Sequence, residues 1–285
     1  MQGTKINRDT ILENLRAEIA AGRPIIGSGA GVGLIGRIVD RAGIDLIVVY
    51  NSGHFRMNGY SSILGNLPVG DANAMVLEMG EELIINAVRR APVVGGIFGV
   101  DPTRDMRRFL ERMADVGYSG VINYPTVGKM NGRLRYELEH VGLGLDREIA
   151  TMRMAADMGF LTLAYVFCPE DARRYAAAGA DVLVSHAGLT QGGDIGLQSD
   201  GTLEESMEKT EAILRAGLEE NPGIIPLCHG GAIISPDDAR AVFRQTSAVG
   251  FIGASSIERI PVEQIVSRTV ESFKSLPLDE AADPA

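Results

Sequence analysis

The chain has 285 residues, of which 45% are hydrophobic and 22% are charged, a composition typical of a soluble globular protein with a large core. Its formal net charge of −10 argues against nucleic acid or an anionic membrane surface as the main partner. The two cysteines, Cys168 and Cys228, lack metal-type spacing, so neither a disulfide framework nor a structural zinc is expected.

The N-terminal segment predicts an amphipathic helix near residues 8–21, with Ile11, Leu12, Leu15 and Ile19 at helical spacing. This segment is polar and charged overall, unlike a signal peptide or a transmembrane span, so we expect a cytoplasmic location. The apolar stripe must be buried against either the same subunit or a neighbouring one. Of these alternatives we favour a homo-oligomer, because symmetric closure is the usual outcome of such contacts.

From residue 24 onward, apolar segments alternate with helical patterns eight times. The expected strands are 24–29, 45–52, 93–100, 120–124, 161–167, 181–186, 224–229 and 249–254. The helices that follow them are 34–42, 74–90, 105–117, 146–158, 170–178, 203–219, 236–245 and 262–276. Near-continuous apolar strands are typical of parallel sheets. The pattern predicts the α/β class and a single (β/α)8 TIM-barrel domain: an extra N-terminal helix in 1–23, the barrel in 24–276 and a flexible tail in 277–285.

Two connections are longer than the others, residues 53–73 after the second strand and residues 125–145 after the fourth. Both leave the carboxyl ends of strands, which is the face where barrel enzymes carry their active sites. Long loops in a compact domain often form lids or binding loops. We therefore expect a site beneath these two loops.

Small residues follow the last two strands, as Gly230-Gly231 and as residues 253–256, GASS. In TIM barrels these loops commonly bind phosphate through backbone N–H groups. Arg56 and Arg259 could supply positive charge to a carboxylate or phosphate. The sequence thus predicts a small anionic substrate, with the following binding residues: Ser28, Asn51, Arg56, Gly188, Gly230, Gly231, Gly253, Ala254, Ser255, Ser256 and Arg259.

Three of the four histidines, His54, His186 and His229, fall at or just beyond expected strand ends. Asn123 lies within the fourth expected strand. We expect these four residues to share one cavity with Asn51 and to perform acid–base chemistry there. The alternatives are structural histidines or a histidine-bound metal, although no pair has a helix-face spacing such as HExxH. If a divalent cation such as Mg²⁺ binds, Asp101 and Glu258 are the better candidates, because hard cations prefer carboxylate oxygen.

Two other functional interpretations of the sequence are disfavoured. Residues 31–36, GVGLIG, match a dinucleotide fingerprint, but the second strand ends in residues 50–52, YNS, rather than in an acidic residue, so we expect a tight turn and no nucleotide cofactor. The four lysines all lie outside the expected strands, which argues against a Schiff-base aldolase. Only Lys129 could reach the expected site.

Four motifs together resemble a known family. They are residues 117–128, GYSGVINYPTVG; residues 187–190, AGLT, with Gly192-Gly193; residues 229–231, HGG; and residues 253–259, GASSIER. The chain resembles the phosphoenolpyruvate-hydrolase-like TIM-barrel family, also called the TIM-barrel signal-transduction or IGPS-like barrel domain, over residues 25–265.

This resemblance implies a TIM barrel and a hydrolase or lyase-type enzyme that acts on phosphonopyruvate or a phosphoenolpyruvate-like keto acid, with Mg²⁺ neutralising the phosphonate. It also implies His186 or His229 as the proton-transfer group. Authentic phosphonopyruvate hydrolases carry a Glu-Asp-Lys loop after the fourth strand, whereas residues 125–132 here read PTVGKMNG, with no acidic pair. The alternative is a barrel that binds a ligand and regulates or scaffolds without turnover.

Overall fold

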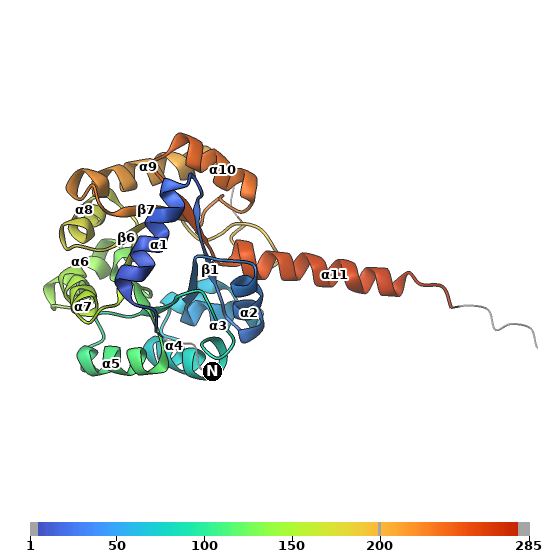
Figure 1. Ribbon diagram of the computed structural model, residues 1–285, viewed down its shortest axis with the longest axis horizontal. Coiled ribbons are helices and arrows are strands. Elements are labelled where there is room, and N and C mark those ends of the chain that lie inside the picture. Colours follow the sequence, from blue (N-terminus) through green and yellow to red (C-terminus); the bar gives the residue numbers. More distant parts are fainter. Residues whose placement is uncertain (1–4, 199–200, 279–285) are drawn as a thin grey trace, which may run out of the picture.

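The structure is a computed structural model that describes residues 5–198 and 201–278. Within these residues, parallel strands close into a barrel in the order β1 to β8, and β1 pairs with β8 (Figure 1). The strands are β1 (Ile25–Gly29), β2 (Leu46–Val49), β3 (Val93–Ile97), β4 (Gly120–Asn123), β5 (Leu161–Val166), β6 (Val182–His186), β7 (Ile225–His229) and β8 (Gly250–Gly253). The predicted (β/α)8 architecture is confirmed.

Helices surround the barrel: α2 (Gly33–Arg41), α4 (Ala72–Glu78), α5 (Met106–Val116), α7 (Leu145–Asp157), α8 (Pro169–Ala177), α9 (Leu203–Glu220) and α10 (Pro236–Gln245). The helix expected over residues 74–90 is instead α4 followed by a π-helical segment, η2 (Met79–Ile84). Glycine ends α5 as the sequence predicts, because Gly117 adopts a left-handed φ of 114°.

The N-terminal helix α1 (Arg8–Ala20) closes the bottom of its own barrel. Its Ile11, Leu12 and Leu15 join the apolar cluster inside the barrel and are at most 8% exposed. Arg8 anchors the helix through an ion pair with Asp181, at 2.6 Å. The apolar stripe is therefore satisfied within one subunit, and it gives no support to the expectation that this helix mediates self-association.

The two long loops contain short helices that the sequence pattern missed. The first holds α3 (Asn51–Met57) and the 3-10 helix η1 (Ser62–Asn66). The second holds the 3-10 helix η3 (Val127–Lys129) and α6 (Gly132–His140). Glycine, serine and asparagine within α3 favour turns over helices, which explains why the apolar periodicity is weak there.

The glycines of residues 31–36 make a tight turn between β1 and α2. A Cβ on Gly31 would lie 2.3 Å from the carbonyl oxygen of Gly53 on α3, and one on Gly33 would lie 2.7 Å from that of Leu83 on η2. Glycine is therefore required for close packing. This packing supports the tight-turn interpretation over the dinucleotide fingerprint.

The last helix, α11 (Ile260–Lys274), follows a π-helical segment, η4 (Ser255–Arg259), and projects away from the barrel (Figure 1). No residue of α11 is buried. Residues 279–285, most of the expected flexible tail, lie outside the described residues. Among the helices of residues 5–198 and 201–278, none combines the length and apolar character needed to cross a membrane.

Candidate active site

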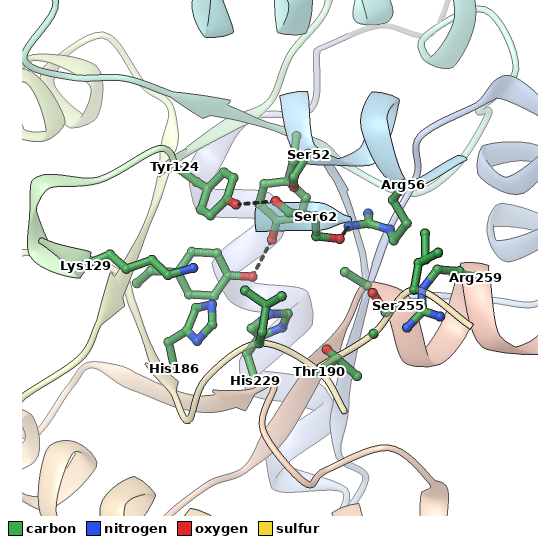
Figure 2. A pocket seen from close by; sticks show the side chains of 16 residues that line it. Ser52, Arg56, Ser62, Tyr124, Lys129, His186, Thr190, His229, Ser255 and Arg259 are labelled. Carbon is green, nitrogen blue, oxygen red and sulfur yellow. Dashed lines mark hydrogen bonds between the residues drawn. The ribbon is translucent and has the colours of Figure 1, made fainter. Parts of the chain in front are cut away.

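A small pocket opens at the carboxyl ends of the strands, as the barrel architecture predicts (Figure 2). Its free space is about 40 Å³, enough for a few solvent-sized groups, so it suits a small ligand. His186 at the end of β6 and His229 at the end of β7 line it, together with Arg56 from α3 and Arg259 from η4. These four predicted site residues are thus brought together, along with Ala254 and Ser255.

Both arginines of the pocket are paired with carboxylates, one buried and one half-buried. Arg56 forms an ion pair with Glu258, whose Oε2 also accepts a hydrogen bond from the N–H of Gly31 at 2.8 Å. Arg259 binds Glu263 of α11 at 2.7 Å and donates to the carbonyl of Gly192 at 2.9 Å. The guanidinium charges are therefore largely balanced before any ligand enters.

Lys129 is different. It reaches into the pocket from η3, on the side opposite Arg56 and Arg259 in Figure 2. Within residues 5–198 and 201–278, its ammonium has no hydrogen-bond or ion-pair partner. Burial lowers the pKa of Lys129 from 10.5 to about 8. Lys129 is consequently the uncompensated cation of the pocket, where the anionic group of a ligand would replace its lost hydration.

The two histidines lie against each other, with ring centroids 4.6 Å apart. His229 Nδ1 lies 2.6 Å from the carbonyl oxygen of Ile252, and the backbone N–H of Gly188 donates to His186 Nδ1 at 3.1 Å. Burial lowers the pKa of His229 from 6.5 to about 4 and lowers that of His186 well below its usual value. Both rings are therefore neutral at pH 7.

Three tyrosines border the pocket. The hydroxyl groups of Tyr50 and Tyr165 share a hydrogen bond of 2.6 Å, and Tyr124 accepts one from Asn66 at 2.7 Å. Burial raises the pKa values of Tyr50 and Tyr165, so both remain protonated and neutral. These hydroxyls add hydrogen-bonding capacity to the pocket without adding negative charge.

Two of the expected cavity residues, His54 and Asn123, lie outside the pocket. His54 is exposed on α3, and its ring packs against Phe55 rather than entering the pocket. Asn123 is fully buried, where its amide contacts Glu148 at 2.9 Å, Thr126 and the backbone of Tyr165. Asn123 thus contacts the loop after β4, and neither residue lies in the pocket where their predicted catalytic roles would place them.

Asn51 and Asp101 line a separate groove of about 540 Å³ beside the pocket. The side chain of Asn51 is held by the carbonyl of Gly65 and the N–H of Ser52. Its predicted contact with the ligand of the histidine pocket is therefore not supported. The groove and the pocket are distinct because their described lining residues do not overlap.

The glycines of the predicted phosphate cradle make close packing contacts. A Cβ on Gly230 would lie 2.2 Å from the carbonyl oxygen of Gly188, and the N–H of Gly231 already donates to that same oxygen at 3.0 Å. A Cβ on Gly253 would meet Ile257 at 2.5 Å. These glycines serve close packing, and other expected binding residues likewise fall outside the pocket lining, namely Ser28, Gly188 and Ser256.

The chemistry of the donor set does not suit Mg²⁺ at the expected carboxylates. Glu258 is occupied by Arg56 and Gly31, while Asp101 is paired with Arg104 and accepts from Thr103. No aspartate or glutamate is among the described residues that line the pocket. Over residues 5–198 and 201–278, no group of three His, Cys, Asp or Glu side chains could hold a metal ion.

Sequence reasoning missed the tyrosines and the loop that closes the pocket. Tyr50 and Tyr124 lie at or near the carboxyl ends of the expected strands 45–52 and 120–124, a position that could have marked them. Leu189, Thr190 and Ile195 belong to the loop after β6, which Arg259 contacts through the carbonyl of Gly192. That contact joins segments 67 residues apart and has no local signal.

The sequence profile described as phosphoenolpyruvate hydrolase-like matches residues 10–276. The chain belongs to the phosphoenolpyruvate hydrolase-like family. It is 46% identical over 273 residues to two tomato (Solanum lycopersicum) proteins, the ToMV susceptible protein tm-1(GCR26) and the ToMV resistance protein Tm-1(GCR237). Each match covers 95% of this chain but 36% of the tomato protein, so the chain spans about a third of the length of these relatives.

Solved structures share the fold at low sequence identity. A phosphoenolpyruvate phosphomutase from Streptomyces platensis is 18% identical with a TM-score of 0.58, covering 92% of this chain and 87% of that one. A phosphonopyruvate hydrolase in complex with oxalate and Mg²⁺ is 19% identical with a TM-score of 0.55, covering 96% and 92%. At these identities the likeness establishes the fold alone.

Proposed function

We propose that the protein is a cytoplasmic hydrolase or lyase-type enzyme that acts on a small phosphorylated or phosphonate keto acid, of the phosphonopyruvate or phosphoenolpyruvate type. The observation that carries this proposal is the pocket itself. It combines the unpaired Lys129 ammonium with two neutral histidines, His186 and His229, and has no carboxylate among its described lining residues. Such a site attracts an anion and offers ring nitrogens for proton transfer.

The family supports the substrate class, because its description refers to phosphoenolpyruvate hydrolysis. Mg²⁺ is bound in the phosphonopyruvate hydrolase structure that shares this fold, but the carboxylates in residues 5–198 and 201–278 do not fit that role. The proposed chemistry therefore uses the protein's own groups. Lys129 binds an anionic group of the substrate, the tyrosine hydroxyls orient it, and the histidines move protons.

The test is release of phosphate and pyruvate from phosphonopyruvate and from phosphoenolpyruvate, measured with the purified full chain. Reactions with millimolar Mg²⁺ and with EDTA should give the same rate, because the described residues hold no carboxylate cluster. Variants Lys129→Met and His229→Gln should lose turnover, whereas His54→Gln, on the surface, should retain it. Release of neither product from either substrate would contradict the proposal.

A second candidate is a barrel that binds a ligand and regulates or scaffolds without turnover. The absence of a metal-binding acid cluster among the described residues favours it. Thermal-shift screening distinguishes the two functions. Stabilisation by phosphonopyruvate or oxalate without product release would support the binding module.

We also propose that the protein self-associates through α11. The apolar side chains Val266, Val270 and Phe273 are 55–70% exposed on this projecting helix. In a (β/α)8 barrel, the helix after the last strand normally covers the wall next to the first helix. Here that first helix, α2, leaves Leu34 67% and Ile38 53% exposed. A second copy that lays its α11 across α2 would bury both apolar surfaces, and two-fold symmetry would make the exchange reciprocal.

A further inference from the structure

The hydrogen bonds at the two buried histidines fix where each ring carries its proton. A carbonyl oxygen only accepts hydrogen bonds, so His229 Nδ1, 2.6 Å from the Ile252 oxygen, must be the protonated nitrogen. A backbone N–H only donates, so His186 Nδ1, 3.1 Å from the Gly188 nitrogen, must carry the lone pair. The two contacts therefore impose opposite requirements on the two rings.

A neutral imidazole has one proton, so each assignment also fixes the second nitrogen. His229 Nε2 is left with a lone pair, and His186 Nε2 is left with the proton. Neither Nε2 has a protein partner within residues 5–198 and 201–278, and neither is among the fully enclosed polar atoms that lack one. Because both rings line the pocket, these two atoms are presented to a ligand.

We propose that His186 and His229 form a fixed donor–acceptor pair, in which His186 Nε2–H donates to the ligand and the lone pair of His229 Nε2 accepts a proton from the attacking group. The stacked contact of His186 with Phe167, at 4.7 Å, and the contacts of both rings with Tyr165 restrict ring rotation. The roles of the two histidines are thus set by the backbone contacts and are not interchangeable.

The surroundings keep both rings neutral. Desolvation is the main cause that lowers the pKa of both rings. The positive charges of Arg56 and Lys129 near His229, and of Lys129 and Lys209 near His186, act in the same direction. The tyrosines that contact the rings remain uncharged. Among the described residues that line the pocket, no carboxylate opposes this effect. An imidazolium would therefore be disfavoured at either position in the free protein.

This step rests on the proposed function. In it, the two histidines have different roles in a single hydrolysis reaction. Water oxygen bonds to phosphorus while its proton passes to His229 Nε2. The bond from phosphorus to the enol oxygen or to C3 breaks, and its electron pair stays with the leaving enolate, whose oxygen accepts a hydrogen bond from His186 Nε2–H. The proton that His229 received passes through solvent to the enolate, which leaves both rings in their starting neutral tautomers, so atoms and charge balance.

The tautomers can be measured without any assumption about turnover. Protein labelled with ¹⁵N-histidine has four histidines, and the exposed His54 and His140 serve as references. Loss of one signal set in His186→Gln or His229→Gln assigns the buried pair. At pH 7 we expect a proton on Nδ1 of His229 and on Nε2 of His186. The reverse tautomer of either ring, or a doubly protonated ring, would overturn the proposal.

Kinetic measurements then test the roles of the two histidines separately from the proposed hydrolase function. With phosphonopyruvate, His229→Gln should lower kcat about 10²–10⁴-fold and remove the loss of activity that protonation of His229 causes near pH 4. His186→Gln should keep that acid limb, and His54→Gln should match the wild type. An unchanged acid limb in His229→Gln refutes the role of His229. Correct tautomers with no wild-type turnover refute the hydrolase function and support the pair as a binding device.

Discussion

The charge of Lys129 is expected to control ligand binding and its pH dependence. The free protein holds the pKa of this residue at about 8, against 10.5 for an exposed lysine, because burial disfavours the ammonium. The lysine is charged below that pH and neutral above it. If only the charged form binds an anion, affinity is constant below pH 8 and falls as the pH rises through that value. Arginine at the same position would stay charged throughout.

The magnitude follows from one charged hydrogen bond. Such a bond contributes about 1.5–3 kcal/mol, so Lys129→Met should raise the Kd by about 10–150-fold at pH 7. For the wild type, the Kd should rise about tenfold for each pH unit above 8 until it approaches the Kd of Lys129→Met. Lys129→Arg should show no such rise between pH 8 and pH 10.

Isothermal titration with oxalate, a small dianion, measures these Kd values at pH 7, 8, 9 and 10. Lys209→Met is the matched control, because Lys209 lines the neighbouring cavity rather than the pocket. Its Kd should follow that of the wild type, and thermal denaturation should confirm that every variant is folded. A wild-type Kd that is constant from pH 7 to pH 10, or unaltered binding by Lys129→Met, would refute the role assigned to Lys129.

Three further outcomes are expected. Glu258→Gln should reduce the free energy of unfolding by about 3–5 kcal/mol in urea denaturation, because it leaves the buried Arg56 unpaired, and the double variant with Arg56→Met should recover part of this loss. Oxalate binding should be the same in Mg²⁺ and in EDTA, and a Kd lowered by Mg²⁺ would show that a metal site exists. Light scattering should give the mass of a dimer or a larger assembly. Val266→Asp should dissociate this assembly, whereas Thr269→Asp, at a polar position of α11, should not. A wild-type mass of one chain would contradict self-association.

The barrel could be predicted because its determinants are local. Each strand is a short apolar run, and helices end at glycines such as Gly117. The hydrophobic period and the ends of the helices are therefore both visible in the sequence. Pairing of His186 with His229 followed as well, because their strands are neighbours in a barrel and both histidines occupy the carboxyl ends. For these two residues, the position along the strand was sufficient to predict that they lie together.

The expected site residues that lie outside the pocket could not be placed from the sequence, because their positions depend on side-chain direction and on distant contacts. Asn123 also occupies a strand end, but its side chain points toward Glu148 on α7 rather than into the barrel mouth. Glu258 is paired with Arg56 from a segment 202 residues away, so its availability for a metal could not be judged locally. Alternation along a strand places a side chain on one of two faces only if the register is known.

The pocket and the projecting helix are structurally connected. Glu263 lies in the first turn of α11, where it binds Arg259 and also accepts the N–H of Asp194 in the loop after β6. The same loop supplies Thr190 and Ile195 to the pocket. Phe273 lies ten residues further along the helix, a span of about 15 Å. A partner that holds the apolar stripe of α11 would therefore also restrict the helix turn that supports Arg259 and this loop, which links assembly to the geometry of the ligand site.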